Sequence, residues 1–522
     1  MSNPLFVTKS VDDIRADLAG EHHQLKRSLG GVDLVMLGIG AIIGTGIFVL
    51  TGHAAAANAG PAVALSFVIA GVASAFAGLC YAEMASMIPI AGSAYTYAYA
   101  TMGELVAWII GWDLILEYAV ASSTVAHGWS HYFQDLIGLA GIRVPALFSK
   151  APFDYDPVAG HLVSTGALFD LPAILIALAV TVILVIGIKE SARFNAAMVA
   201  VKLSVVLFVI GVGVFYIDPK NWIPFAPYGL TGVSFFGHTL FGQVGAGGEP
   251  LGMLAGAAVI FFAYIGFDAV STQAEEAKNP KRDVPIGIIA SLIICTILYI
   301  AVSGVITGMV PYDKINIDAP VSSAFGQVGL PWAHLLISIG ALTGITSVLL
   351  VMMLSQPRIF LAMARDGLLP RGFFAAIHPK FRTPWKATIL TGIFVATVAA
   401  LVPLRILAEL VNIGTLLAFV IVCGAVLIMR RSDPNAERPF RAPWVPFTPI
   451  AGIVLCLLLM FSLPAENWVR LAVWLLIGFL IYFGYSRHHS VMKHHLEHMI
   501  AKHGLSPAGM PSTHEDDPNR RD

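Results

Sequence analysis

The first long apolar segment of the chain contains a glycine cluster at the depth where a membrane helix is normally continuous. Residues 38–48 read GIGAIIGTGIF, with four glycines and one threonine. A helix in lipid must satisfy its own backbone hydrogen bonds, and irregular backbone is tolerated there only against protein or a wet cavity. The segment therefore predicts an interrupted helix whose free N–H and C=O groups face the interior of a helix bundle.

The composition is that of a membrane protein. Of the 522 residues, 57% are hydrophobic and 12% are charged, whereas soluble domains carry about 25% charged residues. Apolar runs of ~20 residues, long enough to span a bilayer, recur along the whole length. We predict an all-α polytopic membrane protein embedded in a lipid bilayer, with twelve transmembrane helices near residues 32–51, 61–88, 97–125, 171–188, 194–216, 253–275, 286–310, 332–363, 386–403, 406–429, 447–464 and 467–485.

The loops between these segments differ in their content of lysine and arginine. Alternate loops are rich in basic residues, among them Lys281, Arg282, Arg365 and Arg430, and the opposite set is sparse. The positive-inside rule then places both termini in the cytoplasm, in agreement with an even number of spans. The net charge of −1 gives no reason to expect a nucleic-acid partner.

The sixth predicted span is interrupted as well. It has Gly266 near its centre, with Asp268 beside it. Because it lies five spans after the first, the two interruptions occupy corresponding positions of two repeats, a pattern that points to a transport site at the repeat interface. The alternative is a pair of unrelated glycine packing faces, since Gly40 and Gly44 form a GxxxG motif.

The two interruptions are chemically suited to an α-amino acid. Where the first span resumes as a helix, unpaired N–H groups and the positive end of the helix dipole favour a carboxylate. Where each half-helix ends, free carbonyl groups favour an ammonium group. The substrate-contacting residues that we expect at the two breaks are Ile42, Ile43, Gly44, Thr45, Gly46, Ala263 and Ile265.

Several longer motifs are similar to a known family. They are GAIIGTGIF (40–48), GEL (103–105), GWDLILEY (111–118), FAYIGFD (262–268) and EEAKNPKRDVP (275–285). Together they resemble the amino acid–polyamine–organocation (APC) superfamily of permeases, in particular the cationic amino acid transporter branch and its bacterial relatives. The resemblance covers about residues 25–485.

The resemblance implies a fold and a set of roles. The fold is a five-plus-five inverted repeat (LeuT-like) with discontinuous helices 1 and 6 plus two extra helices. In this family Phe262 would cap the substrate, Glu117 would border the side-chain pocket, and Lys202 would stand where sodium-independent members carry a lysine. We expect a bacterial inner membrane protein and these segments: 1–30 cytoplasmic tail, 31–217 first repeat, 218–252 outer loop, 253–431 second repeat, 432–486 extra helices and 487–522 cytoplasmic tail.

The polar residues inside the spans have alternative interpretations. Lys202 either couples transport to protons or extends to the interface as an amphipathic side chain. Asp268 either caps the freed helix end or joins a gating network. Ile345 lines the side-chain pocket or simply packs, and the same alternative holds for Phe262. Two further residues lie where relatives of this fold hold a sodium ion, Thr346 and Ser347.

These observations favour a secondary active amino-acid transporter, proton-coupled by alternating access. The alternative is an amino-acid exchanger without net proton coupling. The proton would be the coupling ion, sodium is not expected, and we expect no cofactor, no metal site and no catalytic residue. The chain lacks the GxSxG and HExxH motifs that an enzyme hypothesis would need. Whether a small single-span accessory subunit binds stays open.

Overall fold

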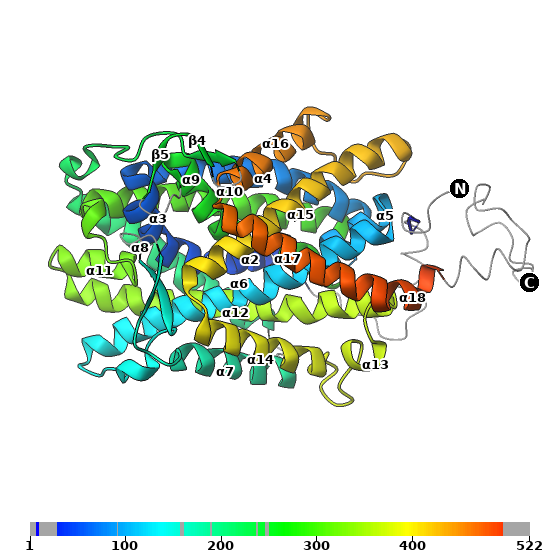
Figure 1. Ribbon diagram of the computed structural model, residues 1–522, viewed down its shortest axis with the longest axis horizontal. Helices are drawn as coiled ribbons and strands as arrows, with labels where there is room; N and C mark the ends of the chain where they lie inside the picture. The colour runs from blue at the N-terminus through cyan, green and yellow to red at the C-terminus, as the bar shows by residue number, and fades with distance from the viewer. Residues whose placement is uncertain are drawn as a thin grey trace, which may run out of the picture.

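The computed structural model describes residues 7–9, 29–90, 92–156, 161–187, 191–235, 238–245 and 250–493. Its helices run mainly along the long axis of the molecule (Figure 1). The main helices are α2 (Gly31–Ile42), α4 (Val63–Met87), α5 (Ser93–Thr101), α6 (Glu104–Leu139), α7 (Leu171–Ile186), α8 (Ser191–Gly213), α9 (Met253–Ile260), α10 (Pro280–Met309), α11 (Pro320–Gln327), α12 (Pro331–Arg365), α13 (Arg371–Phe374), α14 (Trp385–Leu401), α15 (Leu404–Ser432), α16 (Phe447–Phe461), α17 (Ala465–Ile481) and α18 (Arg487–His489).

Three short hairpin-like pairs of strands lie in the loops. All are antiparallel: β1 (Phe153–Asp156) with β2 (His161–Ser164), β3 (Val233–Phe235) with β4 (His238–Phe241), and β5 (Gln243–Val244) with β6 (Pro250–Leu251). In the first pair Phe153 lies opposite Ser164. The strands of the last two pairs lie beside α9, which continues the chain into the bundle (Figure 1).

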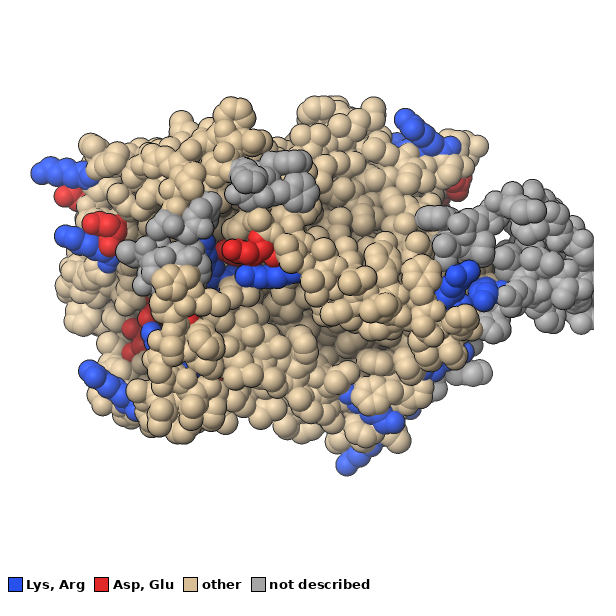
Figure 2. All heavy atoms as spheres, viewed as in Figure 1, with Lys and Arg blue, Asp and Glu red and all other residues tan. Residues whose placement is uncertain are grey.

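The bundle has the dimensions and surface of a multi-pass membrane protein. In the described part of the chain, eight helical stretches are long and apolar enough to cross a membrane, and three shorter apolar helices accompany them. On the face drawn in Figure 2, charged side chains lie at the right-hand end and over the left half, where one acidic and basic group reaches close to the middle of the view, and most of the remaining surface is uncharged. The number of crossings and the inverted repeat stay predictions.

The third predicted span, 97–125, is wrong in its bounds. The chain forms the short helix α5, turns at Gly103 with φ of 93°, and only then begins α6, which continues to Leu139. The left-handed backbone at Gly103 ends the first helix, because residues with a side chain adopt it at a cost. The helix extends past residue 125 because its polar residues find buried partners, as when Asp135 accepts hydrogen bonds from Ser338 and His334.

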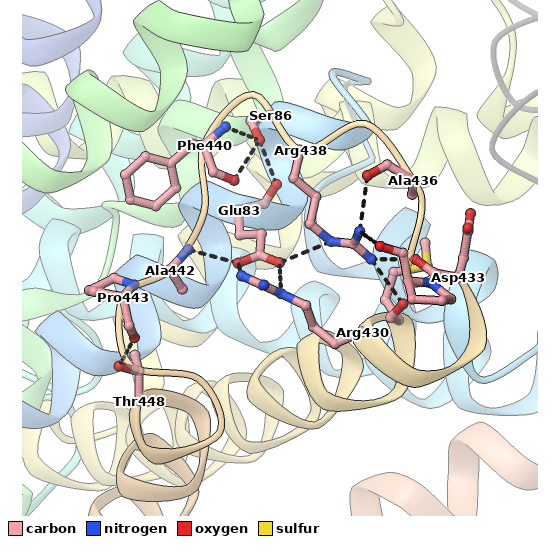
Figure 3. Close-up of polar contacts among 12 residues, drawn as sticks. Glu83, Ser86, Arg430, Asp433, Ala436, Arg438, Phe440, Ala442, Pro443 and Thr448 are labelled. Carbon is pink, nitrogen blue, oxygen red and sulfur yellow. Dashed lines mark hydrogen bonds and ion pairs between the residues drawn. The ribbon is translucent and has the colours of Figure 1, made fainter.

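A buried carboxylate joins three segments at the end of the bundle where α4 and α15 end. Glu83 on α4 is 1% exposed, and its two oxygens accept hydrogen bonds from Arg430 Nε at 2.8 Å and Nη2 at 2.9 Å. The backbone amide of Ala442 donates to the same carboxylate at 2.7 Å, and Arg438 Nε lies 3.5 Å away. Figure 3 shows that these contacts attach the loop after α15 to α4.

We predict that Glu83→Gln destabilises the protein, because it leaves two arginines facing a neutral group. Removing one partner of a buried pair costs about 3 kcal/mol at the low end of the usual range, and Arg430 is partly exposed. The measurement is the apparent unfolding temperature in detergent. The control is Glu437→Gln, which breaks the exposed pair with Lys281 and costs less than about 1 kcal/mol. Equal shifts for both variants would contradict the structural role of Glu83.

Candidate functional site

The first apolar helix is interrupted at the glycine cluster. α2 ends at Ile42, Ile43 has extended backbone with φ of −75° and ψ of 101°, and a π-helical turn begins at Gly46. In the described structure, the amides of Gly44, Thr45 and Gly46 donate no backbone hydrogen bond across this break. The hydroxyl of Thr45 is buried and also has no partner in the described residues. Three backbone amides and one hydroxyl, all within residues 44–46, are therefore available to a ligand.

The second interruption follows α9. A 3-10 turn over Phe261–Tyr264 ends in extended backbone at Ile265, and Gly266 has φ of 113°. A Cβ on Gly266 would lie 2.9 Å from the carbonyl oxygen of Ala41 and 2.8 Å from the Met352 side chain. Both the left-handed backbone and the close approach require glycine at this position.

The two breaks contact each other directly. A Cβ on Gly46 would lie 2.4 Å from the Cα of Ala263, which shows how close the two backbones are. The hydroxyl of Tyr299 on α10 lies 2.8 Å from the carbonyl oxygen of Ile42 and 2.9 Å from that of Ala263. Because a hydroxyl carries one proton, it cannot fully satisfy both carbonyl groups, and each oxygen retains a lone pair for another donor.

Lys202 connects α8 to the first break and to α12. Its ammonium donates to Gly40 O at 2.7 Å, Ile43 O at 2.9 Å and Ser347 Oγ at 2.8 Å. The residue is 0% exposed. An ammonium has three N–H donors, and each has an acceptor here, so the side chain does not extend to the interface. The neighbouring Thr346 is oriented differently and accepts from Trp129 Nε1 at 3.0 Å.

A small cavity of about 10 Å³ lies between the two breaks. Six of the predicted substrate-contacting residues line it, and so do four that the sequence did not indicate, which are Ala41, Val125, Val348 and Met352. The predicted six are Ile42, Gly44, Thr45, Gly46, Phe262 and Ile265. The other predicted residues, Ile43, Ala263, Glu117 and Ile345, do not line this cavity. Its wall is largely aliphatic and aromatic.

The acidic residues Glu117 and Asp268 do not line the cavity. Glu117 is fully buried on α6, and neither carboxylate oxygen has a hydrogen-bond partner in the described structure. The next residue, Tyr118, donates its hydroxyl proton to Asp268 Oδ2. Asp268 stands in the first turn of the 3-10 helix Asp268–Glu276. It therefore both occupies a helix N-terminus, where negative charge is favourable, and ties that segment to α6.

Two kinds of residue at this site could not be predicted from the sequence. Tyr299 lies within an apolar span, and its only signal is that a buried tyrosine hydroxyl needs a partner. The aliphatic residues Val125 and Val348 carry no signal, because a valine facing a cavity and one facing lipid look the same in the sequence.

The helix bundle and its paired interruptions define a membrane permease, and comparisons with known proteins agree. A family model for amino acid permeases matches residues 29–484. The chain is 48% identical over 491 residues to the branched-chain amino acid permease BcaP of Bacillus subtilis, covering 94% of this chain and 99% of that one. It is 46% identical over 488 residues to the methylthioribose transporter of the same bacterium, with 94% and 99% coverage.

A plant relative is more distant. The chain is 41% identical over 440 residues to the vacuolar cationic amino acid transporter 4 of Arabidopsis thaliana, covering 83% of this chain and 68% of that one. The protein belongs to the amino acid permease family of the APC superfamily, as the motif resemblance implied. Its relatives are transporters and not enzymes.

We predict that Gly46→Ala lowers amino-acid uptake by at least about tenfold, because the added methyl group forces the two breaks apart and overpacking of this kind costs about 1–3 kcal/mol. Its Cβ would meet backbone rather than a flexible side chain. The control is Gly304→Ala, whose Cβ would meet nothing within 4 Å. Uptake is measured in proteoliposomes with protein that elutes as a single species. Unchanged uptake by the Gly46 variant would show that close contact between the breaks is unnecessary.

Proposed function

We propose that the protein is a secondary active amino-acid transporter that holds the α-carboxylate and α-amino groups of its substrate on the uncoiled backbone of the two breaks. The observation that carries this proposal is the set of polar groups without partners at the first break. The amides of residues 44–46 and the hydroxyl of Thr45 have no partner in the described structure, and these three residues line a cavity that the second break also lines. Backbone amides at the start of a helical segment suit a carboxylate.

The carbonyl groups at the breaks suit the ammonium end of the substrate. Ile42 lines the cavity, and its carbonyl oxygen shares the single hydroxyl proton of Tyr299 with Ala263. A substrate ammonium would supply the donor that this arrangement lacks. The same cavity thus offers donors for one end of an α-amino acid and acceptors for the other.

The wall of the cavity favours a neutral apolar side chain. Val125, Phe262, Ile265, Val348 and Met352 contribute aliphatic, aromatic and thioether surface, and none of the lining residues is acidic. A cationic side chain would need a carboxylate, because a buried charge without a partner is costly. Branched-chain substrates, which are named for one of the bacterial relatives, would match this surface.

We predict that unlabelled leucine, isoleucine and valine compete with labelled leucine for uptake, and that lysine and arginine compete at least about tenfold more weakly. A substrate charge without a buried partner loses well over 1.4 kcal/mol of binding, the amount that corresponds to tenfold. The measurement is a competition panel in proteoliposomes. Strong competition by lysine would mean that Glu117 reaches the substrate in a state where the cavity is larger.

The position of Lys202 supports proton coupling. Its ammonium holds the end of α2, the break itself and α12 together through three charge-assisted hydrogen bonds. A neutral amine would keep only two N–H groups for these three oxygen atoms and would turn its lone pair toward the third. Loss of the proton would therefore loosen the first break from α8 and α12. In this proposal the protonation state of Lys202 shifts the equilibrium between the outward-open and inward-open states of the transporter.

We predict that Lys202→Met loses concentrative uptake driven by a pH gradient, since methionine keeps the apolar stem and removes all three donors. The control is Lys220→Met, which removes an exposed lysine of an outer loop. Both variants are compared in proteoliposomes with and without an imposed gradient. If the Lys202 variant still concentrates substrate along the gradient, the coupling role is wrong. If the wild-type protein transports only against preloaded substrate and ignores the gradient, the exchanger alternative holds.

The charge distribution supports an orientation in the membrane. Basic residues are concentrated around the start of α10 and in the loops that follow α12 and α15. The positive-inside rule assigns that end of the bundle to the cytoplasm. We place the protein in a bacterial inner membrane with both termini in the cytoplasm. Fusion of a reporter to either end, active only in the cytoplasm, tests this assignment.

A further inference from the structure

A second cavity lies on the outside of the bundle, away from the two breaks. It is a groove of about 560 Å³ between the first turns of α10 and the loop that follows α15. Its residues are Asn279, Lys281, Arg282, Pro285, Ile286, Ile289, Ala290, Ile293, Pro439 and Phe440. Most of its lining residues are apolar, and two, Lys281 and Arg282, are basic. The cavity between the two breaks has no basic lining residue.

One face of α10 continues the apolar part of the groove into the bilayer. Ile286, Ile293 and Ile297 are spaced so that they lie on one side of the helix, and the latter two are 55% and 62% exposed. From Ile286 to Ile297 the helix rises by roughly 17 Å at 1.5 Å per residue. The hydrocarbon core of a bilayer is about 30 Å thick, so this face matches the acyl chains of one leaflet.

The rim of the groove is cationic on the same face. Arg282 precedes Ile286 by four residues, one helical turn, and in the described structure it has no ion-pair partner. Lys281 also lines the groove, and its ammonium contacts both carboxylate oxygens of Glu437 at 3.0 Å. That pair is exposed, at 44% and 69%, and such pairs exchange partners easily because each contributes little.

The opposite wall of the groove is held in place by buried contacts. Phe440 donates its amide proton to Ser86 Oγ at 3.2 Å, and the amide of Ala442 donates to Glu83. Figure 3 shows this loop attached to α4 and α15 through the carboxylate of Glu83 and through Arg438. The aromatic wall therefore has a fixed position relative to α10, as a binding groove requires.

We propose that this groove binds an anionic phospholipid of the membrane leaflet at this end of the bundle. Its phosphate group would contact Arg282, Lys281 and the amide of Asn279, and one acyl chain would cover the isoleucine face of α10. The pairing of a basic rim with an apolar face one leaflet deep selects a lipid over a free anion, which would leave the isoleucines uncovered. Basic pockets at the membrane surface recognise anionic headgroups in this way.

The test uses the full-length protein, delipidated and titrated with phosphatidylglycerol or phosphatidylcholine, with bound lipid counted by native mass spectrometry. We expect a preference for phosphatidylglycerol that falls on the order of fivefold for each basic residue removed. Lys281→Gln with Arg282→Gln should therefore bring the two lipids close to equal retention. Glu437→Gln, which releases Lys281 from its partner, should strengthen retention of phosphatidylglycerol.

The control is Lys380→Gln with Arg382→Gln, which removes two exposed charges from the loop between α13 and α14 and should leave lipid retention unchanged. Equal losses in both double variants would overturn the proposal, because they would reflect net charge rather than the groove. Inorganic phosphate is added as a competitor of bound phosphatidylglycerol. If it displaces the lipid as strongly as added phosphatidylglycerol does, the groove is a free-anion site instead. A protein dimer without retained lipid would show that a second copy covers this face. None of these outcomes bears on uptake at the breaks, so failure here leaves the transport proposal standing.

Discussion

The ammonium group of Lys202 is the interaction on which the rest of the site depends. A helix that stops in the middle of a membrane leaves carbonyl groups that cost free energy unless something donates to them. Lys202 supplies donors to Gly40 and Ile43 from one side, and Tyr299 supplies one to Ile42 from the other. The break can persist because its carbonyl side is partly satisfied by side chains, while its amide side is left for a ligand.

The second break is likewise stabilised by a few specific residues. Gly266 allows a left-handed turn at a place where Ala41 and Met352 leave no room for a side chain. Tyr299 then joins the carbonyl groups of both breaks through one hydroxyl. The result is a cavity whose polar groups are main chain and whose apolar wall comes from neighbouring helices. Side-chain specificity can therefore change through residues such as Val125 and Val348 without altering how the α-carboxylate and α-amino groups are held.

The sequence predicts some parts of this site better than others. Gly44, Gly46 and Gly266 indicate the breaks in the sequence, because glycines occur at corresponding positions of two spans that lie five apart. Lys202 is recognisable as a lysine within an apolar span. The bounds of α6 could not be read correctly, since Ser130 and Asp135 look like the end of a span until Asp170 and His334 are known to pair with them. That error places Val125 at the very end of the predicted span, whereas in the structure it lies within α6 and is the α6 residue in the cavity wall. Such long-range pairing, like the contact of Tyr299 with both breaks, is invisible in a local pattern.

The most direct test of this account is an experimental density map of the protein with bound leucine. The account predicts the substrate carboxylate within hydrogen-bonding distance of the amides of residues 44–46 and of Thr45, with its ammonium against the carbonyl groups of Ile42 and Ala263. It also predicts that the side chain contacts Val125, Phe262 and Val348. Leucine bound away from both breaks, or first and sixth spans that run as unbroken helices, would contradict it.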